Sequence, residues 1–123
     1  ELHLAGGRPI DPPTFERETL AKLGMPREVV MRHRTAQFGH VFAGDGYSAG
    51  YYSYLWADTL TADAFEAFVE AGGPYDRDVA KRLLTHVFSA GNTVDPAVAY
   101  RAFRGRDPGI QALMRKRGFP VTG

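Results

Sequence analysis

The sequence predicts an all-α protein, and three features of its 123 residues support this fold class. Apolar residues recur at helical spacing between clearly marked turns. Glycine and proline fall between these segments more than within them. Apolar and polar residues do not alternate over several positions between turn signals, as they would in a half-buried strand. We expect residues 1–123 to form a single helical segment, with short capped turns and one glycine-rich loop.

Capping residues mark the ends of the expected helices. Asp11-Pro12 places a side-chain acceptor before a proline at the first helical position, and Gly24 closes that segment. Asp95-Pro96 and Asp107-Pro108 repeat the device, and each is predicted to open a short helix. Two further glycines are expected to end the later helices, Gly91 and Gly118. The helical pattern is weakest over residues 31–46, which show no helical face and are expected to form a loop.

The composition limits the classes of protein that fit. Apolar residues make up 44% of the chain and charged residues 24%, which is typical of a soluble globular protein. No run approaches the roughly 18 apolar residues that a membrane-spanning helix needs, so no membrane partner is expected. The absence of cysteine excludes disulfides, thiol catalysis and cysteine-ligated metal. A cysteine-free chain suits the cytoplasm, and we expect a cytoplasmic location.

Charge is distributed unevenly although the net charge is only +1. Residues 58–78 carry six acids against one base, and residues 101–117 carry six bases against one acid. Such runs are usually solvated helix faces, and these two are of opposite sign, so they suit each other or another part of the protein. A nucleic-acid surface is the alternative for the basic run, but no binding motif accompanies it.

A tyrosine-rich segment is the most informative part of the sequence. Tyr47, Tyr51 and Tyr54 are spaced so that one continuous helix would place them on one face. Tyr52 and Trp56 would share another face, where we expect them to pack in a core. Three phenols fit a ligand-binding cleft, because each buried hydroxyl needs a hydrogen-bond partner. Spacing alone does not decide between a cleft and a core stripe.

A histidine and two glycines precede these tyrosines. Gly44 and Gly46 flank Asp45, and glycines there permit positive φ and backbone motion, which suits a lid, a hinge or an ordinary tight turn. His40 lies just before this loop and fits a ligand, an acid or base, or a structural histidine.

The order of these blocks resembles one known family. Residues 40–58 resemble the C-terminal part of the thimet-oligopeptidase and peptidyl-dipeptidase family, nearer to its bacterial branch of peptidyl-dipeptidases and oligopeptidase A-like enzymes. The resemblance continues, in the same order, through residues 63–68, 89–91, 103–108 and 112–118.

This resemblance implies a fold, a reaction and site residues. It implies an all-helical C-terminal portion of a zincin-like catalytic domain in a zinc metallopeptidase that hydrolyses short peptides. Tyr51 and Tyr54 would be catalytic, through stabilisation of the transition state. The substrate-binding residues would be His40, Tyr47, Gly44 and Gly46.

The family's zinc motif, His-Glu-x-x-His, is missing from the sequence. The four histidines are His3, His33, His40 and His86, and none is four residues from another. We therefore expect this chain to hold no metal, since His33 and His40 would form only a makeshift pair. The zinc would belong to the parent enzyme, in an upstream part of the catalytic domain with which this chain pairs.

Two hypotheses follow for the chain itself. It is a C-terminal portion of the peptidase, inactive alone, with exposed apolar surface through which it self-associates. Alternatively it is a stand-alone peptide-binding or degenerate non-catalytic module.

Overall fold

The structure is a computed structural model, and it describes residues 6–121. These residues form helices joined by turns, with no strand among them, which confirms the all-α prediction. They group into two compact units, Glu1–Tyr52 and Ser53–Gly123, and the expectation of a single domain stays a prediction. None of the helices between residues 6 and 121 has both the length and the apolarity needed to cross a bilayer.

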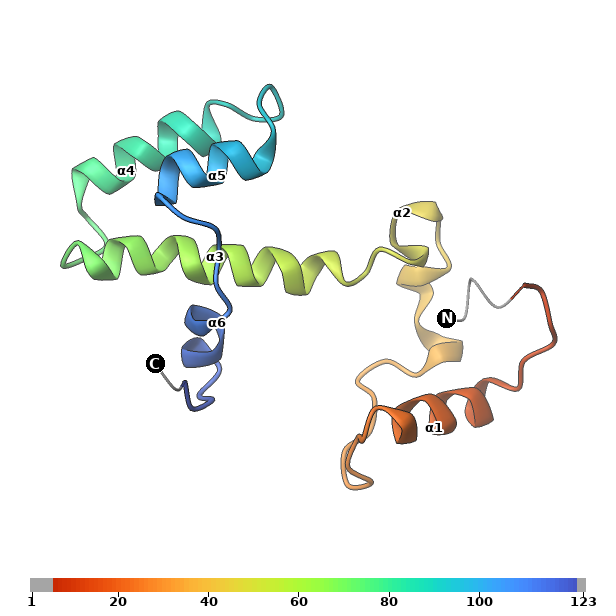
Figure 1. Ribbon diagram of the computed structural model, residues 1–123. Helices are drawn as coiled ribbons and strands as arrows, with labels where there is room; N and C mark the ends of the chain where they lie inside the picture. The colour runs from red at the N-terminus through yellow and green to blue at the C-terminus, as the bar shows by residue number, and fades with distance from the viewer. Residues whose placement is uncertain (1–5, 122–123) are drawn as a thin grey trace. The chain divides into compact units, whose positions relative to one another are not determined.

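The first unit contains one regular helix and a series of short turns (Figure 1). Its elements are α1 (Pro12–Lys22), the 3₁₀ turns η2 (Thr35–Gln37) and η3 (Gly39–Val41), and α2 (Asp45–Ser48). Asp11 caps α1 by accepting a bond of 3.1 Å from the Thr14 backbone N–H. Glu16 of α1 accepts bonds from the backbone and the hydroxyl of Thr35 at 3.0 and 3.2 Å, which ties η2 to α1. The region expected to be a loop is thus made of single turns.

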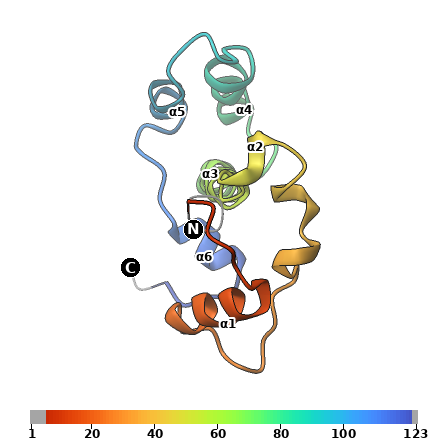
Figure 2. The same ribbon diagram turned by 90° about the vertical axis from the view of Figure 1, so that its right-hand side faces the viewer.

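The second unit is built around its longest helix. Its elements are α3 (Ser53–Glu70), α4 (Arg77–Leu83) with its π-helical continuation η4 (Leu84–Phe88), α5 (Pro96–Arg104) and α6 (Gln111–Lys116). Figures 1 and 2 show α4 and α5 side by side on one side of α3, with α6 on the opposite side. Two apolar clusters follow from this arrangement. Ala67, Val79 and Phe103 form one between α3, α4 and α5, and Ala62, Ala112 and Leu113 form the other between α3 and α6.

A buried carboxylate connects α3 to the chain that follows it. The Asp63 side chain is 3% exposed and accepts bonds of 2.6 Å from the Tyr100 hydroxyl and 2.7 Å from Arg106 Nη2. Arg104, whose side chain is 6% exposed, donates from Nε to the Asp63 carbonyl oxygen at 3.0 Å. Its two terminal nitrogens each reach a Glu70 carboxylate oxygen at 2.7 Å. This bidentate pairing is among the stronger polar contacts available to a protein.

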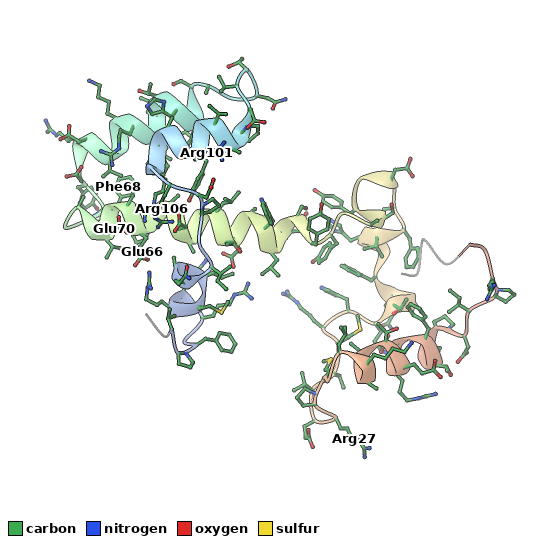
Figure 3. All side chains as sticks on the ribbon, viewed as in Figure 1. Arg27, Glu66, Phe68, Glu70, Arg101 and Arg106 are labelled. Carbon is green, nitrogen blue, oxygen red and sulfur yellow. The ribbon has the colours of Figure 1, made fainter. Side chains whose placement is uncertain are left out.

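The acidic and basic runs face each other, as the sequence analysis allowed. Besides Arg104 and Arg106, three bases near the C-terminus pair with acids of α3: Arg115 with Glu66 at 2.7 Å, Lys116 with Asp58 at 2.6 Å and Arg117 with Asp58 at 2.9 Å. Figure 3 shows Glu66, Glu70 and Arg106 gathered along α3. The remaining base, Arg101, pairs with Asp107 at 2.8 Å. The basic run is therefore matched by acids of the same chain.

Most of the predicted caps are confirmed. The Asp95 carboxylate accepts the first free N–H groups of α5 at 3.0 and 3.1 Å. Glycines with positive φ follow α1 and α6, at Gly24 and Gly118, and allow the Schellman arrangement in which the next residue bonds back into the helix. The prediction that Asp107-Pro108 opens a helix is wrong. The carboxylate of Asp107 is engaged by Arg101 instead, and α6 begins three residues later than proposed, at Gln111.

We expect Asp63→Asn to destabilise the protein by roughly 2–4 kcal/mol, because its amide NH₂ would face donors of Tyr100 or the arginines in a buried site. Urea unfolding followed by circular dichroism measures the change. Asp107→Asn is the matched control, since this side chain is 73% exposed and its ion pair should contribute less than about 1 kcal/mol. Equal losses of stability in the two variants would show that burial does not explain the contribution of the Asp63 carboxylate to stability.

The Asp63 carboxyl also sets a pH dependence. Desolvation, the largest influence on its pKa, raises it, but the bonds from Tyr100 and Arg106 and the two arginine charges outweigh burial and hold the pKa below its ordinary value of 3.8. A lowered folded-state pKa stabilises the fold above the unfolded pKa, and this contribution is lost as pH falls through the folded value. We expect the urea midpoint to fall on acidification below about pH 4, and to fall less in Asp63→Asn. Parallel curves for the two proteins would contradict this assignment.

Candidate functional site

The tyrosine segment does not form the single helix that its spacing predicted. α2 ends at Ser48, residues 49–52 form turns, and α3 begins at Ser53. Tyr47 therefore lies in α2, Tyr51 in the turns and Tyr54 in the first turn of α3. Glycine disfavours the helical state, and Gly46 and Gly50 both lie in this stretch. The expectation that all three rings share one helix face is wrong.

The structure nevertheless brings two of the tyrosines together with the predicted histidine. The His40 ring lies 4.5 Å from the Tyr47 ring and 5.5 Å from the Tyr51 ring, measured between centroids. Tyr47 and Tyr51 are 39% and 40% exposed, so their rings are half accessible rather than part of a core. Partly exposed rings of this kind do not form a buried core stripe, and the binding role of these residues stays a prediction. Tyr54 belongs to the second unit and is also exposed.

One ring that the sequence analysis did not single out lies within this cluster. Phe38 stacks on His33 with centroids 4.7 Å apart and planes at 11°. It meets Tyr51 edge to face at 4.8 Å and 85°, and it lies 6.2 Å from His40. We call the rings of His33, Phe38, His40, Tyr47 and Tyr51 the aromatic cluster. The place of Phe38 in this cluster could not be predicted from the sequence, because no motif marks an apolar ring that lies among polar aromatic side chains.

The glycines of the loop act differently from what we expected. Gly44 has φ 169°, an extended conformation open to any residue, and Gly46 lies inside α2. Neither glycine adopts the left-handed conformation that glycine permits. Gly50 is the position where a side chain is excluded, because a Cβ there would lie 2.8 Å from the Gly46 carbonyl oxygen and 3.9 Å from the Tyr47 Cα.

The predicted core role of two other aromatics is also wrong. Tyr52 is 71% exposed and Trp56 is 64% exposed, and Leu55 between them is exposed as well. The partners of α3 within the second unit begin at Asp58, which pairs with the last turn of α6. The first turns of α3 extend past those partners, so their large side chains remain uncovered.

A metal site does not form among the described residues. Between residues 6 and 121 no three His, Cys, Asp or Glu side chains group closely enough to hold an ion, and His33 stacks on Phe38. The side chains present therefore do not fit the zinc that the family resemblance implies.

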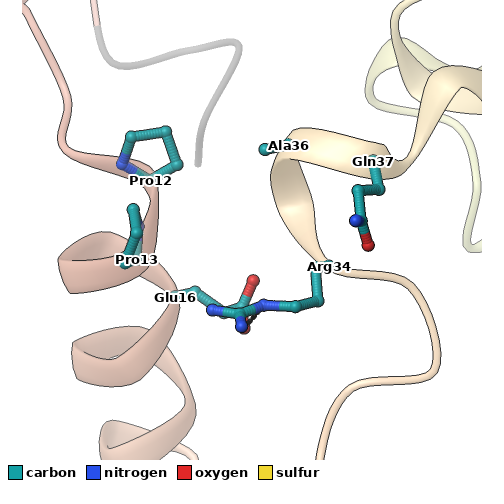
Figure 4. Close-up of a pocket in the computed structure, with 6 residues that line it drawn as sticks. All are labelled: Pro12, Pro13, Glu16, Arg34, Ala36 and Gln37. Carbon is teal, nitrogen blue, oxygen red and sulfur yellow. Dashed lines mark ion pairs between the residues drawn. The ribbon is translucent and has the colours of Figure 1, made fainter.

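A small open hollow lies elsewhere in the first unit, between α1 and η2, where Arg34 meets Glu16 at 3.4 Å (Figure 4). It contains none of the predicted site residues.

We expect Gly50→Ala to displace Tyr47 and to destabilise the protein by about 1–3 kcal/mol, because the new methyl group meets backbone that cannot swing aside. The ring signals of Tyr47 and His40 in nuclear magnetic resonance spectra measure the displacement. Gly39→Ala is the control, since a Cβ at Gly39 meets no atom within 4 Å. Unchanged ring signals in Gly50→Ala would contradict the proposed close approach.

Comparisons with known proteins agree with the resemblance read from the sequence. The family model described as Peptidase family M3 matches residues 14–119. Oligopeptidase A of Escherichia coli is 46% identical over 81 residues, which cover 66% of this chain and 12% of that protein. Dipeptidyl carboxypeptidase of Salmonella typhimurium is 40% identical over 106 residues, which cover 85% of this chain and 15% of that protein. The chain thus spans less than a sixth of the length of these relatives. The chain therefore belongs to peptidase family M3.

Proposed function

We propose that this chain is the substrate-gripping portion of a zinc-dependent oligopeptidase or peptidyl-dipeptidase that hydrolyses short peptides. The observation that carries the proposal is the grouping of His40 with Tyr47 and Tyr51, at 4.5 and 5.5 Å, inside the segment that the family model matches. Partly exposed aromatic side chains that also carry N–H or O–H donors suit a peptide ligand. Its backbone offers carbonyl acceptors and its side chains offer apolar surface.

The chemistry assigned to the chain is recognition and charge stabilisation. Tyr51 and Tyr54 are the proposed catalytic residues, because a phenol hydroxyl donates a hydrogen bond to an oxygen that gains negative charge during peptide hydrolysis. His40 and Tyr47, with the backbone of Gly44 and Gly46, would bind the substrate. In the parent enzyme zinc would supply the Lewis acid, and its ligands would come from outside this chain.

The exposed start of α3 supports an upstream partner. Leu55 and Trp56 are more than half exposed, and large apolar side chains on consecutive helix positions are normally covered by protein. We propose that the upstream part of the catalytic domain covers them, and that the isolated chain self-associates through the same surface.

The pairing of the basic run with acids of α3 argues against nucleic acid as a partner. A cytoplasmic location fits the cysteine-free composition.

A stand-alone peptide-binding module is the second candidate, and the partly exposed Tyr47 and Tyr51 rings beside His40 would serve such a module as well. The two candidates differ in what joining the upstream part achieves. A peptidase portion gains zinc and cleaves peptide when joined, whereas a binding module shows peptide binding by calorimetry in the 123-residue chain and no cleavage in either form.

In the parent enzyme we expect Tyr51→Phe and Tyr54→Phe each to lower kcat about 10²-fold with little change in KM, because each removes one donor that acts mainly in the transition state. Steady-state hydrolysis of a fluorogenic peptide measures both constants. Tyr52→Phe is the matched control, since it removes a neighbouring phenol that is 71% exposed and carries no proposed role.

Two results would contradict the proposal. Full activity of Tyr51→Phe and Tyr54→Phe would remove the catalytic role of the tyrosines. Stoichiometric zinc and robust cleavage by the 123-residue chain alone would remove the assignment of the metal to another part of the protein.

A further inference from the structure

We propose that Phe38 is a positioning residue of the active site, which fixes the orientation of the Tyr51 ring. The inference rests on the proposed function, because it assumes that Tyr51 donates to the reacting oxygen. It adds a residue to which neither the sequence pattern nor the family comparison gave a role.

The backbone holds Phe38 firmly. It lies between the two 3₁₀ turns, following η2 and preceding η3, with φ −85° and ψ 70°. Its N–H donates to the Thr35 carbonyl at 3.4 Å, and its own carbonyl accepts from the Val41 N–H at 3.2 Å. η2 is in turn tied to α1 through the bonds from Thr35 to Glu16. Phe38 is half-buried, so neighbouring residues contact part of it.

Tyr51 needs such support because it lies outside a regular helix. Residues 49–52 are turns, and the face of Tyr51 is therefore not fixed by a helical repeat. The Phe38 ring meets it edge to face at 4.8 Å and 85°, a favoured aromatic geometry, and meets His40 at 6.2 Å. Phe38 also stacks on His33, with ring centroids 4.7 Å apart and planes at 11°. Phe38 thus joins the scaffold to the proposed donor.

Phe38 carries no polar hydrogen, so its contribution is geometric. A displacement of about 1 Å in a reacting group lowers the rate by up to about 10²-fold without changing the chemistry. A leucine at this position keeps the apolar volume nearly constant but removes the flat edge that Tyr51 contacts. The orientation of Tyr51 should then become loose, and substrate binding should change less than turnover.

The test compares Phe38→Leu, Phe38→Tyr and the control Phe88→Leu, which makes the same exchange at a 70% exposed position of the second unit. In the 123-residue chain, Phe38→Leu should shift the ring signals of Tyr51, His40 and His33 while the helical circular dichroism stays unchanged. In the parent enzyme it should lower kcat about 10-fold with KM within about twofold. Phe38→Tyr, which keeps the ring, should restore both the signals and the rate.

The outcomes separate the two proposals. Unchanged ring signals in Phe38→Leu, or a kcat equal to that of Phe88→Leu while Tyr51→Phe is impaired, would overturn the positioning role and leave the proposed function intact. Full activity of Tyr51→Phe would overturn the proposed function and the role of Phe38 with it. If Phe38→Leu does not fold, Phe38→Tyr provides the test, because this variant keeps the aromatic ring. A folded Phe38→Tyr protein with a large loss of rate would contradict the positioning role of the ring.

Discussion

The carboxylate of Asp63 ties α3 to α5 and to the segment that leads to α6. It lies on α3, is nearly inaccessible, and receives donors from α5 and from the segment that leads to α6. Burial raises the pKa of the Tyr100 phenol, and the bond to Asp63 raises it further, so this hydroxyl remains a donor. The two apolar clusters are small, and alanines contribute to both. A unit with so little apolar core depends on a satisfied polar centre to define how its helices meet.

Local chemistry explains what the sequence could predict of this fold. Asp11 and Asp95 cap helices because their acceptors lie within a few residues of the N–H groups they serve. The same Asp-Pro pair at Asp107 does not cap a helix, because Arg101, six residues earlier, engages the carboxylate. The complementarity of the two charged runs was visible as composition. Which acid meets which base depends on the packing of α5 and α6 against α3, and a single sequence does not contain that information.

The candidate site was predictable as a set of residues but not as a geometry. Helical spacing suggested one face with three phenols, whereas the turns at residues 49–52 separate Tyr51 from both helices. His40 and two of the tyrosines are still brought together, because contacts between rings replace the helical repeat. The structural role of Gly50 was also not predictable from the sequence, because it depends on a side chain at this position lying 2.8 Å from the Gly46 carbonyl oxygen. Gly44 and Gly46 were singled out only because they lie next to Asp45 in the sequence.

The attachment of α6 has a consequence for how the molecule opens. Its last turn and the following residue are held to α3 by ion pairs whose basic side chains are about half exposed, beside a small apolar cluster formed by Ala62, Ala112 and Leu113 with Met114. Exposed pairs are screened by dissolved ions, whereas the bonds of a buried carboxylate are screened much less. The amide hydrogens of α6 should therefore exchange with solvent through local fluctuations that become more frequent as ionic strength rises. Those of α3 near Asp63 should exchange only through larger openings, so salt divides this small bundle into a labile edge and a slow centre.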